Sequence, residues 1–224
     1  MNLKNKDQEF KIDENIAYFI GVLHSDGCIY VFNDKKRNRK QIRLNLTVGN
    51  KSIPMALKFK NILKDYFSKT VNLRKVPNKS SYVIQTSINR VWHIFQGWNS
   101  EKVPKEIKKN YILFGAYLAG LVDGDGHIKM KYNKDRIIPQ CMIRISSDHP
   151  LKEIKYIIEN CMSCKVHFEY KKGTKGVDTC FYISKKNIDF IENYVYPYIT
   201  LPYKIKRLEG FFRIKKMSLP GVSE

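Results

Sequence analysis

Two segments of this chain match each other and start 99 positions apart. They are Ala17–Gly27 (AYFIGVLHSDG) and Ala116–Gly126 (AYLAGLVDGDG). A single repeat at about half the chain length predicts two similar domains in tandem rather than a solenoid of many short units. A chain of 224 residues is long enough for two such domains with a real apolar core.

The same order of elements follows each segment. The alternation of apolar and polar residues at 42–48 is typical of a half-buried strand. The strands predicted in this way are 28–32, 42–48, 71–76 and 82–86, then 128–132, 142–146, 165–171 and 179–184. The predicted helices after the two segments are 53–67, 89–98, 150–161 and 187–194, and basic or polar turns occupy 33–40 and 133–139.

These elements predict an α+β fold built from two pseudosymmetric α-β-β-α-β-β-α halves with antiparallel sheets. The halves are expected to comprise residues 1–104 and 105–224. The stretch 99–110 contains Pro104 and four lysines, and it reads as the connection between them.

Each repeated segment has a stripe of small residues at positions i, i+4 and i+8, which share one face of a helix. The members are Ala17, Gly21 and Ser25, then Ala116, Gly120 and Gly124. Glycine costs a helix about 1 kcal/mol relative to alanine, so its presence needs a reason. Small stripes allow two helix backbones to approach closely. We therefore predict that the two segments are helices packed together along the pseudo-twofold axis.

An Asp-Gly pair ends each segment, at Asp26-Gly27 and Asp125-Gly126. If the helices pack side by side, the two carboxylates meet where the helices end, and each glycine can adopt the positive φ that ends a helix. One Asp-Gly pair is most simply a turn. Two at matched positions favour a shared site for divalent cations, which prefer oxygen ligands and can promote phosphodiester hydrolysis.

The charge of the chain points to a polyanionic partner. Lys and Arg number 41 against 21 Asp and Glu, which gives a net charge of +20 and a sequence pI near 9.7. An anionic membrane is the weaker choice, since the longest apolar run, 111–122, is too short to span a bilayer. The polar N-terminus shows no signal peptide, so an intracellular protein is expected, in a compartment that the sequence does not identify.

Five cysteines are present: Cys28, Cys141, Cys161, Cys164 and Cys180. An odd number argues against a disulfide framework. Cys161 and Cys164 form a C-x-x-C without the second ligand pair that a zinc site needs. We expect the cysteines to serve as small buried hydrophobic residues, with a metal or redox role for the C-x-x-C as the alternative.

The repeated segments resemble the signature of the LAGLIDADG homing endonucleases. Leu118–Gly126 (LAGLVDGDG) is close to the consensus, and Phe19–Gly27 (FIGVLHSDG) is a divergent copy. The resemblance implies a pseudosymmetric monomer whose motif helices form the interface between halves. Their curved sheets would form a saddle over the major groove of double-stranded DNA.

The same resemblance implies a metal-dependent endonuclease that cuts both strands of a long asymmetric duplex site and leaves cohesive ends. The cofactor would be Mg²⁺ or Mn²⁺, with Ca²⁺ as a non-catalytic substitute. No protein-splicing signature is evident, so an intron-encoded, free-standing enzyme is expected.

Family positions carry over to specific residues here. Asp26 and Asp125 would bind metal, with added ligands from the carbonyls of Ser25 and Gly124. The remaining candidates near the metals are a polar residue or lysine after the second strand of each half and a lysine near each half's end: Asn50, Lys51, Ser147, Lys105 and Lys204. Asp148 stands where the second half would carry the matching lysine. Each lysine could instead be a solvated surface charge.

The first copy of the motif departs from the pattern at two positions. His24 stands where the motif usually has an acid, and Ser25 where it has a small apolar residue. His24 is interpreted either as a packed polar cap or as a residue that tunes the metal site through its ligands.

Strand alternation also selects residues for DNA contact. Arg43, Asn45 and Thr47 share one face, as do Lys129 and Lys131, and Arg144 is similarly placed. Arg and Lys can reach guanine edges and phosphates, and Asn can reach adenine. Further candidates on strands and turns are Tyr30, Lys35, Lys36, Arg37, Arg39, Lys40, Arg74, Lys134 and Arg136. The turn residues could instead be solvated, and the sequence assigns no base to any of them.

Two other functions were weighed. An intron maturase could use the same fold to bind RNA, but loss of a motif carboxylate would favour it, and both are present. A DNA-binding regulator would usually carry a helix-turn-helix extension, for which little sequence follows Glu209. The five histidines form no H-N-H cluster, and no P-loop is present.

Overall fold

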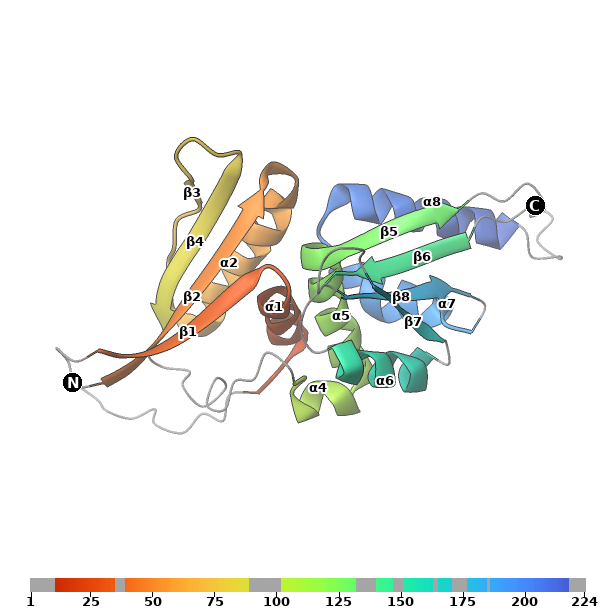
Figure 1. The fold of residues 1–224 in the computed structure, drawn as a ribbon, viewed down its shortest axis with the longest axis horizontal. Helices are drawn as coiled ribbons and strands as arrows, with labels where there is room; N and C mark the ends of the chain where they lie inside the picture. Colours follow the sequence, from red (N-terminus) through yellow and green to blue (C-terminus); the bar gives the residue numbers. More distant parts are fainter. Residues whose placement is uncertain are drawn as a thin grey trace.

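Two four-stranded antiparallel sheets flank a central pair of helices in the computed structural model (Figure 1). The structure describes residues 11–34, 39–88, 102–131, 140–146, 151–162, 165–170, 177–184 and 186–217. The central helices are α1 (Glu14–His24) and α5 (Tyr111–Asp125), which contain the two repeated segments. None of the helices in these ranges has the length and apolar character needed to cross a membrane.

The two sheets have the same strand order. In the first half the order is β1-β2-β4-β3, and in the second it is β5-β6-β8-β7. The strands are β1 (Gly27–Asp34), β2 (Arg39–Gly49), β3 (Arg74–Lys75), β4 (Ser81–Ile88), β5 (Gly126–Lys131), β6 (Gln140–Ile145), β7 (Val166–Tyr170) and β8 (Val177–Ile183). Helix α2 (Ile53–Phe67) joins β2 to β3, and α6 (Leu151–Met162) joins β6 to β7. The predicted α+β fold is confirmed.

The offset of 99 residues continues from the helices into the strand register. Gly27 pairs with Leu46 in the first sheet, and Gly126 pairs with Ile145 in the second. The two sheets therefore start from their motif helices in the same register, and residues that match between halves can be identified by strand pairing.

Each sheet buries one face and leaves the other polar, as strand alternation requires. Leu44, Leu46 and Ile84 on the inner face of the first sheet are at most 1% exposed. Helix α2 covers this face, and its Phe59 ring stacks on Phe19 of α1 at 4.4 Å between centroids. The inner residues of both sheets and of α1 and α5 belong to one continuous apolar core.

The two motif helices begin with the same kind of cap. The carboxylate of Asp13 accepts a hydrogen bond from the backbone N–H of Ile16 at 3.0 Å. The side chain of Asn110 accepts from the N–H groups of Ile112 and Leu113 at 2.9 and 3.3 Å. A side-chain oxygen at this position pairs backbone donors that have no partner within the helix, which fixes the start of each helix.

Several predicted elements differ in extent. The strand predicted at 71–76 is reduced to Arg74–Lys75 in β3, and the connection at 99–110 contains a short helix, α4 (Lys105–Lys109). The helix predicted at 187–194 is α7 (Ile188–Phe190), followed by a π-helix, η2 (Ile191–Val195), and a 3₁₀ turn, η3 (Tyr196–Tyr198). The helix predicted at 89–98 lies outside the described residues.

The last helix, α8 (Pro202–Met217), was not predicted at all. Its apolar positions Leu208, Phe211 and Phe212 are buried, at spacings of three and four residues. Proline at the first helical position is a common start signal. The pattern was therefore readable, but the many basic residues between the apolar positions obscured it.

The described cysteines are free thiols: Cys28, Cys141 and Cys180. Cys141 and Cys180 are at most 1% exposed, as expected for small hydrophobic residues. Burial raises the pKa of Cys141 to about 12, so its thiol stays protonated. The side chains of the C-x-x-C pair are not among those described.

Candidate metal centre and nucleic-acid face

The small-residue stripes bring the backbones of α1 and α5 into direct contact. A Cβ atom on Gly21 would lie 2.1 Å from the carbonyl oxygen of Tyr117, and one on Gly120 would lie 2.2 Å from the carbonyl oxygen of Tyr18. Real Cβ atoms essentially never approach so closely. The predicted packing of the two segments is confirmed, and both glycines are required by space.

The C-terminal ends of the same helices also touch. A Cβ atom on Gly124 would lie 2.0 Å from Ser25 Oγ and 3.3 Å from the backbone nitrogen of Asp26. Ser25 is held in place because its hydroxyl donates to the carbonyl oxygens of Gly21 and Val22. The residues that precede the two motif aspartates therefore lie against each other across the helix pair.

Gly27 and Gly126 play a different part from the predicted one. Gly126 has φ −82° and ψ 145°, which is ordinary extended backbone rather than the left-handed region. A Cβ atom there would lie 2.3 Å from the carbonyl oxygen of Val122, and one on Gly27 would lie 2.6 Å from Cα of Leu23. Glycine is needed at Gly126 because the strand turns back sharply against its own helix, and the expected positive φ was wrong.

Asp26 and Asp125 are both half-buried at the point where the helices end. Burial raises the pKa of Asp26, and the nearby positive charge of Lys204 opposes that rise. Both carboxylates in turn act on Lys204 and raise its pKa. This mutual interaction places the two aspartates and one lysine in a single electrostatic cluster.

Lys204 comes from α8 and is only 1% exposed. Its ammonium group donates to the carbonyl oxygens of Val122 and, at 2.9 Å, Asp123 in the last turn of α5. Desolvation lowers the pKa of Lys204 to about 8, although Asp123, Asp26 and Asp125 oppose that shift. A cation at the C-terminal end of a helix is favourable, so Lys204 has a structural role in addition to its place beside the carboxylates.

A divalent ion fits the donor set at this crossing. Among the described residues, no group of three or more His, Cys, Asp or Glu side chains is placed to hold a metal ion. Two carboxylates with backbone oxygens nearby are what Mg²⁺ commonly uses, since it keeps several waters and takes further oxygens from substrate phosphates. Asp26 and Asp125 would hold the ion, with the carbonyls of Ser25 and Gly124 within the same turn.

Two polar pairs cross the helix interface at matched positions, and the sequence analysis missed their partners. Tyr18 Oη donates to Asp123 Oδ2 at 2.7 Å, and Tyr117 Oη lies 2.9 Å from His24 Nδ1. Tyr18 and Tyr117 are related by the offset of 99, as are His24 and Asp123. His24 is 3% exposed, so the interpretation as a packed polar residue fits the structure.

The Asp123 carboxylate is buried and has further donors from the C-terminal half. Its Oδ2 accepts from the backbone N–H and the hydroxyl of Thr200, at 2.8 and 2.7 Å. Burial raises the pKa of Asp123, while the hydrogen bonds from Thr200 and Tyr18 and the charge of Lys204 lower it. A buried carboxylate needs such partners because its desolvation is costly.

Lys58 of α2 extends this network to the first half. Its ammonium lies 3.7 Å from the centroid of the Tyr18 ring and donates to the carbonyl oxygen of Tyr198 at 3.0 Å. Desolvation lowers the pKa of Lys58 to about 8, against the opposing influence of Asp123. Cation–π contacts of this kind stabilise a partly desolvated ammonium.

The other predicted metal-site residues are more dispersed. Asn50 and Lys51 are exposed in η1 (Asn50–Ser52), directly after β2 ends. Lys105 is exposed in the first turn of α4, unlike Lys204, its match by number. Ser147 and Asp148 lie outside the described residues.

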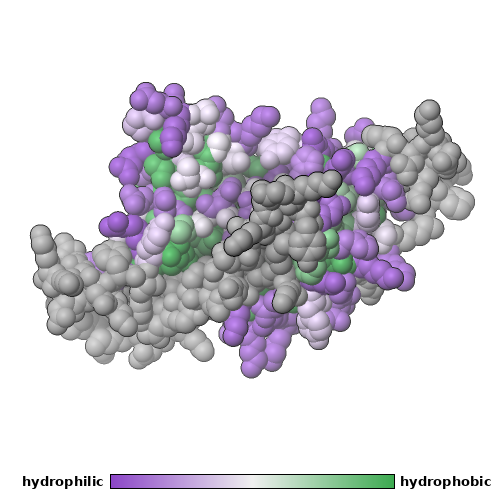
Figure 2. Space-filling model, viewed as in Figure 1, coloured by the Kyte–Doolittle hydropathy of each residue, from purple (hydrophilic) through white to green (hydrophobic). Residues whose placement is uncertain are grey.

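The outer face of the first sheet carries most of the residues predicted there for DNA contact. Tyr30 pairs across the strands with Arg43, and Thr47 lies four residues further along β2. Arg43 and Thr47 are exposed, as is Arg74 on β3, and Tyr30 is 55% exposed. Hydrophilic residues cover much of the described surface of both halves in Figure 2.

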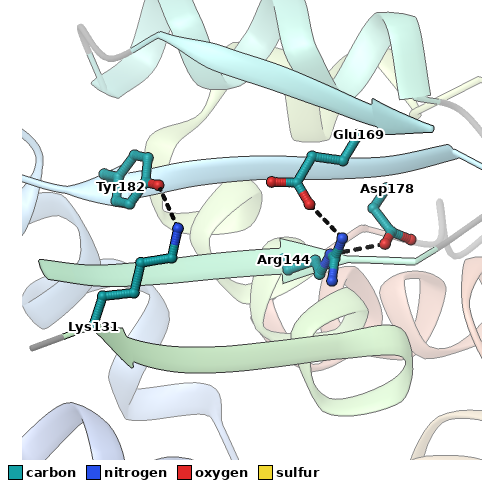
Figure 3. Close-up of polar contacts among 5 residues, drawn as sticks. All are labelled: Lys131, Arg144, Glu169, Asp178 and Tyr182. Carbon is teal, nitrogen blue, oxygen red and sulfur yellow. Dashed lines mark hydrogen bonds and ion pairs between the residues drawn. The ribbon is translucent and has the colours of Figure 1, made fainter. Parts of the chain in front are cut away.

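The outer face of the second sheet carries Lys129 and Lys131 as predicted, with His127 on the same side of β5. The ammonium of Lys131 donates to Tyr182 Oη at 3.2 Å (Figure 3). Burial and four nearby cations, Arg207, Lys129, Lys204 and Arg144, lower the pKa of His127.

Arg144 is not free on this face, although the sequence suggested an unencumbered contact residue. Its Nε lies 2.8 Å from Asp178 Oδ2 on β8, and its Nη2 forms an ion pair with Glu169 on β7 (Figure 3). The sequence analysis did not anticipate these two acids, although the period of two places them on the polar face of their strands.

The remaining basic candidates cannot be placed in the same way. Arg39 and Lys40 lie in β2, but their side chains are not among those described. The turn residues outside the described residues are Lys35, Lys36, Arg37, Lys134 and Arg136.

No protein-family model and no curated protein matches this sequence. Solved structures match its fold. The chain is 17% identical to I-DmoI in complex with DNA and calcium, with a TM-score of 0.59 over 88% of this chain and 97% of that one. It is 16% identical to the I-LtrWI LAGLIDADG homing endonuclease bound to target DNA, with a TM-score of 0.57 over 92% and 91%.

A third similar structure is the homing endonuclease I-WcaI bound to its DNA recognition sequence. It is 17% identical, with a TM-score of 0.57 over 93% of this chain and 94% of that one. These matches span both sheets and the helix pair at once. Together with the two motif copies at the helix crossing, they show that this chain has the fold of the LAGLIDADG homing endonucleases.

Proposed function

We propose that this protein is a site-specific endonuclease that acts as a monomer and hydrolyses both strands of a long, asymmetric DNA duplex with divalent metal ions. The observation that carries the proposal is the pair of half-buried carboxylates, Asp26 and Asp125, at the contact between α1 and α5. The pair lies between two polar sheet faces in a chain of net charge +20. Two sheets of different sequence would read the two sides of the site.

The residues at the crossing have separable tasks. Asp26 and Asp125 would hold Mg²⁺ or Mn²⁺, which would supply a Lewis acid for a phosphate oxygen and lower the pKa of an attacking water molecule. Lys204 offsets the repulsion between the carboxylates and places a cation where the phosphate charge would increase. The close contact of the helices fixes the spacing of the two carboxylates.

The similar structures support the choice of ligand. I-DmoI has been solved with DNA in the presence of calcium, manganese and magnesium. An intron-encoded origin and residues 1–104 and 105–224 as the two halves are part of the same proposal.

The experiment is cleavage of a randomised duplex library with Mg²⁺ by the parent protein and by Asp26→Asn and Asp125→Asn. Asp65→Asn is the matched control, because Asp65 is an exposed acid on α2 away from the crossing. We expect the parent and the control to enrich and cut one long site. The two motif variants should still bind it but cut at least roughly 100-fold more slowly. A parent protein that binds the site and does not cut in Mg²⁺ or Mn²⁺ would contradict the proposal.

A further inference from the structure

The Arg144 cluster is the most distinctive polar group on the outer face of either sheet. Arg144 on β6 lies between Asp178 on β8 and Glu169 on β7, so three neighbouring strands contribute to it (Figure 3). Strand pairing places His127 on β5 and Cys180 on β8 level with Arg144. All of these residues belong to the second half.

The two acids hold Arg144 in different ways. Asp178 is only 1% exposed and lies 2.8 Å from Nε, so it is a fixed anchor. The side chain of Glu169 is 46% exposed, and it pairs with Nη2 at the outer edge of the guanidinium. An exposed ion pair contributes little to stability and is easily exchanged, whereas the loss of a buried partner is not. Glu169 is therefore the replaceable partner.

The fold itself does not require this arrangement, as the first half shows. By strand register, Arg144, Asp178 and Glu169 match Asn45, Val83 and Arg74. The matched positions thus carry an amide, an apolar residue and a cation in place of a cation and two acids. The acidic pair belongs to the second half alone, so it serves the sequence that this half binds.

Carboxylates on a face that meets DNA repel phosphates, so their presence there needs a reason. A guanidinium held through Nε keeps both of its terminal nitrogens in one plane, directed away from the anchor. Those two donors match the O6 and N7 acceptors of guanine, the commonest specific contact of arginine in the major groove. An isolated phosphate oxygen is a poorer replacement for Glu169, because a carboxylate offers the same charge without desolvating a second partner.

We propose that Arg144 reads a guanine in the half-site bound by the second sheet, with Asp178 as its anchor and Glu169 as the acceptor that the base replaces. This inference rests on the proposed function, because it presumes that the outer faces bind duplex DNA. The position read lies near the centre of the target, since Arg144 is next to Ile145, the partner of Gly126 at the end of the motif.

The test is selection of bound duplexes from a randomised library without cleavage, in Ca²⁺, for the parent, Arg144→Lys and Glu169→Gln. Arg43→Lys is the matched control, because it makes the same chemical change on the outer face of the first sheet. Lysine keeps the charge but cannot make the bidentate contact. We expect Arg144→Lys to lower one guanine preference in one half-site by about 5- to 150-fold. Arg43→Lys should leave that position unchanged.

Glu169→Gln separates the reading of the base from the control of access. It should keep the guanine preference, bind non-target duplex more tightly, and raise the magnitude of its salt slope by about 1, because Arg144 then becomes available to phosphates. Since Glu169 is exposed, this variant remains informative if Arg144→Lys unfolds, which thermal melting would reveal.

The outcomes distinguish this inference from the proposed function. A parent that enriches no duplex overturns the proposed function, and this inference with it. A parent that enriches a site whose preferences are the same in Arg144→Lys overturns the role of Arg144 alone. Unchanged binding of non-target duplex by Glu169→Gln overturns the role of Glu169 as the replaceable acceptor.

Discussion

Single side chains between α1 and α5 distinguish the two halves more sharply than the backbone does. Tyr18 donates to a carboxylate, Asp123, whereas its match, Tyr117, contacts an imidazole, His24. Both tyrosines are buried, and desolvation raises both of their pKa values well above the ordinary value. The two hydroxyls therefore remain protonated at all moderate pH values and act as hydrogen-bonding groups.

Removing each hydroxyl should have unequal effects. A hydrogen bond to a charged group contributes about 1.5–3 kcal/mol, against about 0.5–1.5 kcal/mol for a neutral pair. Tyr18→Phe should therefore lower the free energy of unfolding more than Tyr117→Phe, as measured by urea denaturation at neutral pH. Equal losses in the two variants would show that Asp123 is not charged in the folded protein.

Lys58 should give the protein a measurable pH dependence. Its folded-state pKa of about 8 lies below the ordinary value of 10.5, so between these pH values the unfolded chain holds more protons at this position. Stability contributed through this group therefore rises with pH in that window, at most by about 1 kcal/mol per pH unit after solvent screening. Urea unfolding of the parent and Lys58→Met from pH 7.5 to 10 measures the difference.

The control for this experiment is the variant itself, since all other titrating groups are shared. The stability of the parent relative to Lys58→Met should increase as the pH rises through 8. A constant difference across the range would contradict the assigned shift.

At the scale of elements, the contact between α1 and α5 depends on missing side chains. Gly120 has no room for a Cβ, whereas at Gly210 in α8 a Cβ would have no atom within 4 Å. Both residues lie inside helices, so alanine has the same intrinsic advantage at both positions. Only the surroundings differ.

Alanine at these two positions should therefore have opposite effects. Gly210→Ala should raise the free energy of unfolding by about 0.5–1 kcal/mol through helix propensity. Gly120→Ala should lower it by about 1–3 kcal/mol, because the helices must separate, and should slow cleavage as the carboxylates move. Differential scanning calorimetry and cleavage of the selected site check both effects. Similar stabilities for the two variants would contradict the packing described.

The elements that could be predicted from sequence are those with a strong local pattern. The stripes of small residues predicted the α1–α5 contact, and alternation predicted the outer residues of β2 and β5. Residues joined only by the tertiary fold were out of reach: Thr200 with Asp123, Lys58 with Tyr198, and Arg144 with Asp178. Their positions in the sequence are 34 to 140 residues apart, within the offsets that the hydrogen bonds and ion pairs span.

At the scale of the whole molecule, a net charge of +20 predicts binding that depends strongly on salt. If the two outer faces neutralise six to ten phosphates, affinity for duplex DNA should fall by roughly 10³- to 10⁵-fold between 50 and 200 mM salt. Fluorescence anisotropy with a labelled duplex measures the slope. An affinity that does not change over this range would contradict binding of the sheets to the phosphate backbone.

The glycine contacts of α1 and α5 have a consequence for how the protein can change. The distance between Asp26 and Asp125 is set by main-chain atoms in contact, which no substitution elsewhere can enlarge or shrink. The outer strands carry side chains that do not take part in that contact. New target sequences could therefore arise by exchange of residues on the sheets, while the separation of the two cuts in the duplex is inherited unchanged.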